Sequence, residues 1–320
     1  GFNHAQTPTL SVRFGLSAEL FKNFVLDASY NARNSFTEAY VARGSYDVYN
    51  PNPATNSYLL AQVIGDSALN YTNRRNITNQ YNISGTYSYN LKQNHQFKLQ
   101  GGFQALDNTT TVVTAGRQGL PDPNRPYLNL ASPSQQTSGG SATDYSLAGF
   151  FGRFNYSYDQ KYLLEVTGRY DGSSRFSQIL NKQWGFFPGV SAGWVISREE
   201  FMDNVSFINF AKLRASYGET GNQEVGDNYP FVSTVNAGTA YYFNNVLNGG
   251  SSLGNIPNEA ISWETSKQSN IGIDLSVLKN RLNVTFDVYQ KRVEDNLIDF
   301  PISLAQGYTN ASTIPRNAAT

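Results

Sequence analysis

Three segments of the chain place aromatic rings beside amide and charged side chains: AGTAYYFNN (237–245), GETGNQ (218–223) and YDGSSRF (170–176). Aromatic rings can cover the apolar CH faces of a sugar, while amides, carboxylates and guanidinium groups hydrogen-bond to its hydroxyls. A peptide would use the same residue types, so the pattern indicates a ligand-binding surface of either kind. The same side chains could instead pack the loops together or face a protein partner. The candidate ligand-binding residues are Asp171, Arg175, Asn222, Gln223, Tyr241, Tyr242 and Asn244.

Catalytic and metal-binding chemistry has little support in the sequence. His4 and His95 are the only two imidazoles, and the chain has no Cys. No nucleophile is placed near either His by the pattern, so we expect no enzyme activity and no catalytic residues. GETGNQEVGDN (218–228) is rich in oxygen ligands, but its spacing does not fit an EF-hand loop. We therefore expect no metal site and no cofactor.

Ten stretches of alternating apolar and polar residues must position the candidate segments. A period of two indicates β-strands with one apolar face. REEFMDNVSFI (198–208), which joins the seventh stretch to the eighth, could hold one helical turn. The predicted strands are 12–21, 24–33, 76–90, 95–106, 145–158, 161–172, 183–197, 209–219, 269–278 and 281–290.

The connections between these strands alternate largely between short and long. Four of the five pairs are joined by two to four residues, whereas about 40 or 50 residues separate most pairs from the next. This alternation is typical of an outer-membrane barrel, which has tight periplasmic turns and long extracellular loops. The candidate ligand-binding residues all fall on the connections expected outside the cell. The predicted short turns are 22–23, 91–94, 159–160 and 279–280.

Charged residues avoid the apolar parity of the predicted strands until Glu219, at the end of its strand. Arg13, Asp27 and Lys98, for example, all take the other parity. A soluble sandwich would also keep charge off its core face, but its core would favour Leu, Ile and Val over the many Tyr found here. Near the midplane of a membrane, Arg or Lys on the lipid face costs about 2–4 kcal/mol, and aromatic rings collect at the two interfaces. The pattern favours an all-β, antiparallel transmembrane barrel over a secreted all-β domain.

Two groups of aromatic residues on the apolar parity predict the two membrane interfaces. One group lies beside the short turns and the other is expected at the opposite strand ends. The first group is Tyr87, Tyr89, Tyr156, Tyr158 and Tyr162. The second is Tyr30, Tyr170, Trp184 and Tyr217.

Composition narrows the partners further. The 320 residues carry a formal net charge of zero, so the basic excess typical of nucleic-acid binding is missing. Nucleic acid is therefore not an expected partner. The barrel pattern predicts contact with membrane lipid, and the candidate segments predict a glycan or peptide ligand. The absence of Cys excludes disulfides and thiolate metal sites.

Four segments resemble the barrel of SusC/RagA-type TonB-dependent transporters from the outer membrane of Bacteroidetes. The resemblance covers most of the chain from about residue 76. It is carried by FFGRFNYSYDQKYLLEVTGRYDGSSRF (150–176), WGFFPGVSAGWVISREEFM (184–202), KLRASYGETGNQ (212–223) and ISWETSKQSNIGIDLSVLKNRLNVTFDVYQKRVEDNLI (261–298).

The resemblance implies a barrel of about 22 strands that is plugged by a separate domain. It further implies TonB-driven import of a glycan oligosaccharide or a peptide, with a SusD-like surface lipoprotein as partner. On this reading residues 1–320 are part of a single barrel domain, with the plug, which contacts TonB, and the C-terminal strands lying outside the sequence. The alternative is a passive porin, or a surface adhesin barrel without energised transport.

Overall fold

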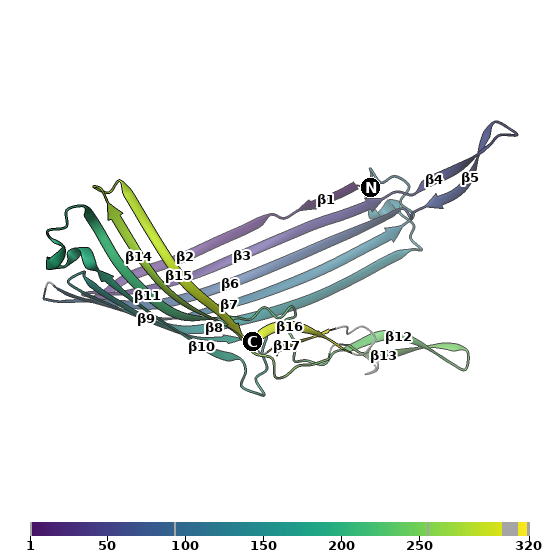
Figure 1. The fold of residues 1–320 in the computed structure, drawn as a ribbon. Coiled ribbons are helices and arrows are strands. Elements are labelled where there is room, and N and C mark those ends of the chain that lie inside the picture. Colours follow the sequence, from purple (N-terminus) through teal and green to yellow (C-terminus); the bar gives the residue numbers. More distant parts are fainter. Residues whose placement is uncertain (1, 93, 255, 303–312, 319–320) are drawn as a thin grey trace. The chain divides into compact units, whose positions relative to one another are not determined.

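The computed structural model describes residues 2–92, 94–254, 256–302 and 313–318, and it consists almost entirely of antiparallel strands (Figure 1). Its helical segments are three short 3-10 turns, η1 (Leu128–Leu130), η2 (Ile196–Arg198) and η3 (Glu200–Met202). Among the described residues, no helix combines the length and the apolar character needed to cross a membrane. The expected all-β antiparallel fold is confirmed.

All ten predicted strands are present in one eleven-stranded sheet. Its order is β1-β3-β6-β7-β8-β9-β10-β11-β14-β15, and β2 also pairs with β3. The strands that correspond to the prediction are β2 (Thr9–Phe21), β3 (Phe24–Arg43), β6 (Ala68–Leu91), β7 (His95–Gln118), β8 (Gln136–Tyr158), β9 (Tyr162–Ser173), β10 (Trp184–Val195), β11 (Ile208–Asn222), β14 (Glu264–Val277) and β15 (Leu282–Glu294).

The eleventh strand, β1 (Phe2–Gln6), pairs with residues 38–42 of β3. Thr7 and Pro8 separate it from β2, yet the backbone N–H of Phe36 still donates to the Pro8 carbonyl at 3.0 Å. Proline has no N–H for the ladder, which explains the break. β1 and β2 therefore run along the same edge of β3.

The chain divides into two compact units, which are described separately. The first comprises residues 1–13, 31–79 and 107–144, and the second comprises 14–30, 80–106 and 145–320. A small buried cluster in the first unit contains Ala42, Leu69, Leu120 and Ala131. A second cluster, in the second unit, is made by Phe176, Phe187, Val225, Ile261 and Trp263.

The strands of the first unit extend well beyond their predicted ends. Here hydrogen-bonding side chains face one another across the sheet: the Asn76 amide donates to the Thr110 hydroxyl at 2.7 Å, and the Asn108 amide donates to Thr78 at 2.8 Å. Such pairs stabilise a sheet without an apolar face. Tyr30 was predicted to lie at a strand end, and this prediction is wrong because β3 continues to Arg43.

Three antiparallel strand pairs lie outside the ten predicted strands, two of them in long connections and the third after β15. They are β4–β5 (Tyr46–Asn52 and Ser57–Ile64), β12–β13 (Val235–Phe243 and Val246–Leu253) and β16–β17 (Asn296–Pro301 and Thr313–Ala318). Asn244 and Asn245 form the two-residue turn of β12–β13 with φ of 51° and 57°, the conformation that a type I′ hairpin turn requires. In Figure 1 this hairpin projects beyond β11 and β14.

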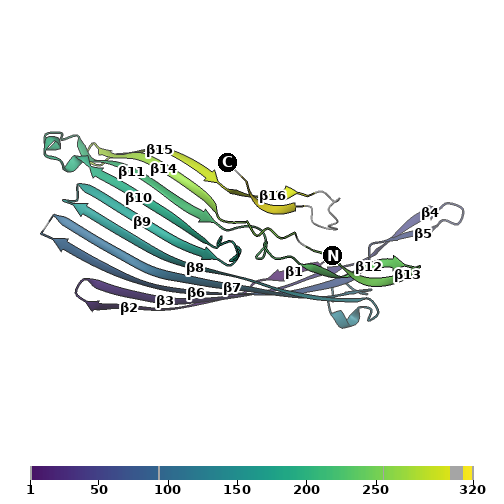
Figure 2. The same ribbon diagram turned by 90° about the horizontal axis from the view of Figure 1, so that it is seen from below.

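The short turns of the second unit all lie at one end of its strands, as Figure 2 shows. Asn23, Asp159 and Asn280 adopt positive φ in these turns, where Asn and Asp are favoured over most other residues. The helical turn expected within 198–208 is confirmed by η3, which follows η2 in the connection from β10 to β11.

The apolar parity of the second unit forms an exposed outer face. Val166, for example, pairs with Phe154 on β8 and Val190 on β10, and its side chain is 44% exposed. At the turn end, Tyr156 packs against Phe97 with ring centroids 4.9 Å apart, as expected for the interface group. The opposite parity of the same strands is called the inner face below.

Candidate ligand-binding surface

Ion pairs line the inner face of the second unit. The opposite charges in each pair largely cancel. The inner face therefore presents hydrogen-bonding groups to a ligand, with only a weak net electrostatic potential. The pairs are Arg153–Glu165 at 3.5 Å, Arg169–Asp171 at 2.8 Å, Arg214–Asp274 at 3.1 Å and Arg214–Asp287 at 2.8 Å.

A hollow of about 770 Å³ lies on this face, along β8 to β11 and β14. We call it the Phe187 hollow. It combines the Phe151 ring with paired charges and amides, which is the residue mixture that binds polar ligands through stacking and directed hydrogen bonds. The Phe187 ring also lines it but is only 7% exposed, because it packs in the buried cluster with Trp263. The side chains that line the hollow include Phe151, Arg153, Glu165, Arg169, Asp171, Phe187 and Gln268.

Glycines on neighbouring strands make room for this arrangement. A Cβ on Gly149 would collide with the Asp171 carboxylate, and one on Gly221 would collide with the Phe187 ring. The Arg169 guanidinium also lies 5.6 Å from the centre of the Phe151 ring, a distance suited to a cation–π contact. The side chains of the hollow are thus held in place by several strands.

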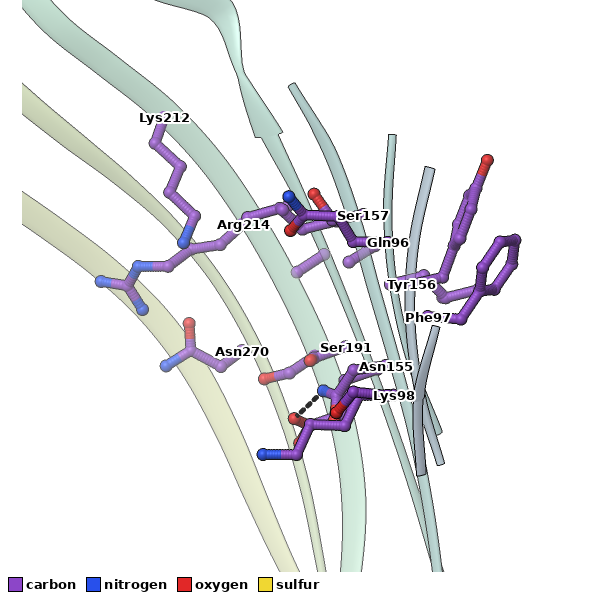
Figure 3. A pocket seen from close by; sticks show the side chains of 18 of the residues that line it. Gln96, Phe97, Lys98, Asn155, Tyr156, Ser157, Ser191, Lys212, Arg214 and Asn270 are labelled. Carbon is purple, nitrogen blue, oxygen red and sulfur yellow. Dashed lines mark hydrogen bonds between the residues drawn. The ribbon is translucent and has the colours of Figure 1, made fainter. Parts of the chain in front are cut away.

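A second hollow, of about 640 Å³, adjoins it toward the short turns and shares Glu165, Ser191 and Ser216 with it. Figure 3 shows Lys212, Asn270 and Lys98 extending from the wall on one side, and Tyr156 and Phe97 on the other. The Asn155 amide donates to the Glu165 carboxylate at 2.6 Å. The lining of this hollow mixes hydroxyl, amide and ammonium groups with apolar side chains.

Among the seven predicted residues, Asp171 lines the Phe187 hollow, but Arg175 and Gln223 serve a different purpose. Arg175 is only 8% exposed. Its guanidinium donates to Asn228 at 2.9 Å and to the Gln223 carbonyl at 3.4 Å, and it pairs with Glu224 at 2.9 Å. The structure therefore brings Arg175 and Gln223 together, as hydrogen-bonded links between two loops.

These links belong to a folded platform built from the connections β9–β10 and β11–β14. Phe176 and Ile261 are fully buried in it, and Trp263 donates its indole N–H to the Gln183 carbonyl at 2.9 Å. The Tyr145 ring lies 4.4 Å from the Arg175 guanidinium carbon. The platform fixes the loops above the inner face of the second unit.

The other predicted residues are more exposed. The Asn222 amide donates to Glu264 at 3.1 Å, next to the platform. Tyr242 is 76% exposed on hairpin β12–β13, and Asn244 is in its turn. The Tyr241 side chain lies outside the described part of the chain. Hairpin β12–β13 forms its own two-stranded sheet, so these residues are on a different element from Asp171.

Arg153, Glu165 and Arg169 take the polar parity of their strands but were not among the predicted site residues. Phe151 and Phe187 were missed as well. The sequence does contain a pattern that could have identified Phe151 and Phe187, because both rings take the polar parity of their strands. An aromatic residue on a face that is otherwise polar indicates either a small core or a ligand contact.

Metal and catalytic groups were not expected here. Within the described ranges, no group of three or more His, Cys, Asp or Glu side chains is placed to hold a metal. The His95 ring nitrogen Nδ1 lies 2.8 Å from the Tyr156 hydroxyl, inside the aromatic group beside the short turns.

The chain matches one protein-family model, described as TonB dependent receptor-like, beta-barrel, over residues 2–319. It is 41% identical over 184 residues to TonB-dependent receptor P39 of Formosa agariphila, covering 58% of this chain and 17% of that protein. It is 35% identical over 165 residues to TonB-dependent receptor SusC of Bacteroides thetaiotaomicron, covering 50% of this chain and 16% of that protein.

Among solved structures, the RagAB peptide transporter superposes with a TM-score of 0.82 at 21% identity, covering 98% of this chain and 33% of that one. At this level of identity the match establishes the fold. The chain spans about a sixth to a quarter of the length of the curated relatives that it matches.

Proposed function

The chain belongs to the TonB-dependent receptor-like β-barrel family, and from this premise we propose that it is part of the wall of an active importer. It is a protein of the bacterial outer membrane, where barrels of this family lie. In the proposal, the outer face contacts lipid, the inner face contacts the ligand, and TonB supplies the energy for import.

The Phe187 hollow is the observation that carries the proposal. Its paired charges and the Phe151 ring suit a polar oligomer without a large net charge. Glycan oligosaccharides and peptides both meet that description. RagAB is a peptide transporter, so peptides are tested beside glycans.

The seven candidate residues divide into two roles in this proposal. Asp171, fixed by Arg169, contacts the ligand in the hollow. Arg175, Gln223 and Asn222 hold the platform, so they shape the entrance without touching the ligand. Tyr241, Tyr242 and Asn244, on hairpin β12–β13, contact either arriving ligand or a protein partner.

Exposed apolar residues on two hairpins support the proposal of a surface partner. Tyr58 of β4–β5 is 74% exposed, and Phe243 of β12–β13 is 72% exposed. Aromatic residues exposed this far are enriched at protein interfaces. We propose each hairpin, taken by itself, as a docking surface for a SusD-like lipoprotein, and we take residues 1–320 as part of a single barrel domain.

Growth of cells carrying the full-length protein tests the import function. With TonB intact, cells should grow on one glycan or peptide as sole source, and deletion of TonB should abolish growth while leaving the barrel in the membrane. A passive pore would pass the ligand without TonB, an adhesin would bind cells without import, and an enzyme would convert the ligand in detergent. Any of these three results would overturn the proposal.

A further inference from the structure

An apolar groove of about 410 Å³ crosses the outer face of β2, β3, β6 and β7. Its walls are large and open to the surroundings: Phe14 is 66% exposed, Leu16 67% and Ile83 46%. Ala28 lies among these side chains and leaves the space between them unfilled. We call this feature the Ala28 groove, and all its residues belong to the second unit.

On the neighbouring outer surface, aromatic rings pack against one another. Phe103 packs on Phe150 at 5.0 Å between ring centroids, Phe150 follows Trp184 at 6.4 Å, and Tyr170 stacks on Trp184 at 4.9 Å. This row of rings bounds the groove on one side, since Phe103 also lines it. The groove is therefore a local feature of β2, β3, β6 and β7.

The depth of the groove follows from its distance to the short turns. Its residues lie five to ten positions from the turns at 22–23 and 91–94. At about 3.3 Å per residue and a strand tilt of about 40°, this is about 13–25 Å above the turns. The apolar band of such a barrel is about 25 Å tall, so the groove lies in its outer half.

The outer end of the groove carries a polar group. Tyr30 and Tyr81 stack there with centroids 5.0 Å apart, and both line the groove. Tyr at the edge of an apolar band usually lies at the level of the lipid head groups. The groove thus runs from hydrocarbon depth to a head-group interface.

We propose that the Ala28 groove binds one acyl chain of an outer-leaflet lipid, which in this membrane is the lipid A of lipopolysaccharide. The chain lies in the outer membrane, so at this depth the surroundings of the face are hydrocarbon. The groove, of about 410 Å³, is wide open to the surroundings, so a chain would lie along it rather than inside it. An extended saturated chain fills an apolar groove without leaving polar groups unpaired.

The test compares two substitutions of the same type on outward positions. Ala28→Phe fills the groove, whereas Ala18→Phe adds the same ring on β2 outside the groove. Both remain apolar, so both should insert. Full-length proteins are extracted from outer membranes in mild detergent, and lipid A retained per protein is counted by native mass spectrometry.

We expect the wild type and Ala18→Phe to retain lipid A, and Ala28→Phe to lose at least one molecule per protein. Equal retention in both variants would overturn the proposal, as would a wild type without bound lipid A. If Ala28→Phe loses only a bound phospholipid, the groove binds a lipid of the inner leaflet. If Ala28→Phe changes a dimer to a monomer, the groove binds a second copy of the protein. Either result would also overturn the proposal. Growth on the imported ligand reports separately on transport.

Discussion

The Arg169 guanidinium donates to both carboxylate oxygens of Asp171, two residues further along the same strand, at 3.1 and 2.8 Å. The two side chains point to the same inner face because strand residues alternate. The bidentate geometry leaves both groups with a fixed orientation toward the Phe187 hollow. In the proposed function, this ion pair is the part of the barrel wall that contacts the ligand.

Gly149→Leu should disturb the Arg169–Asp171 ion pair while both of its residues stay unchanged in the sequence. An added Cβ at Gly149 collides with the Asp171 carboxylate, so the ion pair has to shift. We expect the affinity for the ligand that supports growth to fall about tenfold, which is about 1.4 kcal/mol. Isothermal titration with the purified full-length complex measures it. Gly152→Ala, whose added Cβ makes only an ordinary contact with the Gln100 carbonyl at 4.0 Å, should leave the affinity unchanged; an equal loss there would contradict this reading.

Val166→Arg and Thr167→Arg should differ in assembly. Val166 is on the outer face near mid-depth, where Arg costs about 2–4 kcal/mol, while Thr167 lines the Phe187 hollow. We expect the first variant to be missing from the outer membrane and the second to be present at normal levels by immunoblot. Equal levels of both would indicate that β9 is in water on both faces.

Arg175→Met should loosen the platform but not the barrel. The substitution leaves Asn228 and Glu224 without their cation, at a cost of about 2 kcal/mol. Limited proteolysis of intact cells should cut within 223–263 faster than in the wild type. Arg125→Ala removes an exposed Arg with a long 3.7 Å pair and serves as control. Unchanged cleavage in Arg175→Met would show that the apolar cluster alone holds the loops.

Glu199 should make the β10–β11 connection sensitive to acid. The Tyr162 hydroxyl donates to its carboxylate at 2.7 Å and the Trp194 indole at 2.8 Å, and with nearby Lys161 they hold the Glu199 pKa below its ordinary value. A lowered pKa means that the stabilisation is present at neutral pH and is lost as the pH falls below about 4.

Fluorine NMR of 5-fluorotryptophan at position 194 reports this transition. The Trp194 resonance should shift below about pH 4 in the wild type, and the shift should be absent from Glu199→Gln, which cannot titrate. A shift of the same size in both proteins would assign the transition to another group.

The alternation of side chains was enough to predict all ten long strands, because lipid on one face and a polar surface on the other impose a period of two. The strand ends in the first unit were missed, since pairs such as Asn76 with Thr110 stabilise β6 and β7 without an apolar face. Hairpin β12–β13 was missed although Asn244 and Asn245 are turn formers between apolar residues. The burial of Arg175 depends on contacts with residues about 50 positions away, which a local pattern cannot reveal.

Uptake by Thr167→Trp and Val166→Trp shows whether the ligand passes along the inner face. The two positions are adjacent on β9, so the indole faces the Phe187 hollow in one variant and lipid in the other. Initial uptake of labelled ligand is measured in cells with intact TonB, at matched levels of barrel in the outer membrane. If the inner face lines the ligand path, Thr167→Trp lowers uptake at least tenfold and Val166→Trp leaves uptake unchanged. Normal uptake in Thr167→Trp, or equal loss in both, would contradict the assignment of the inner face to the ligand path.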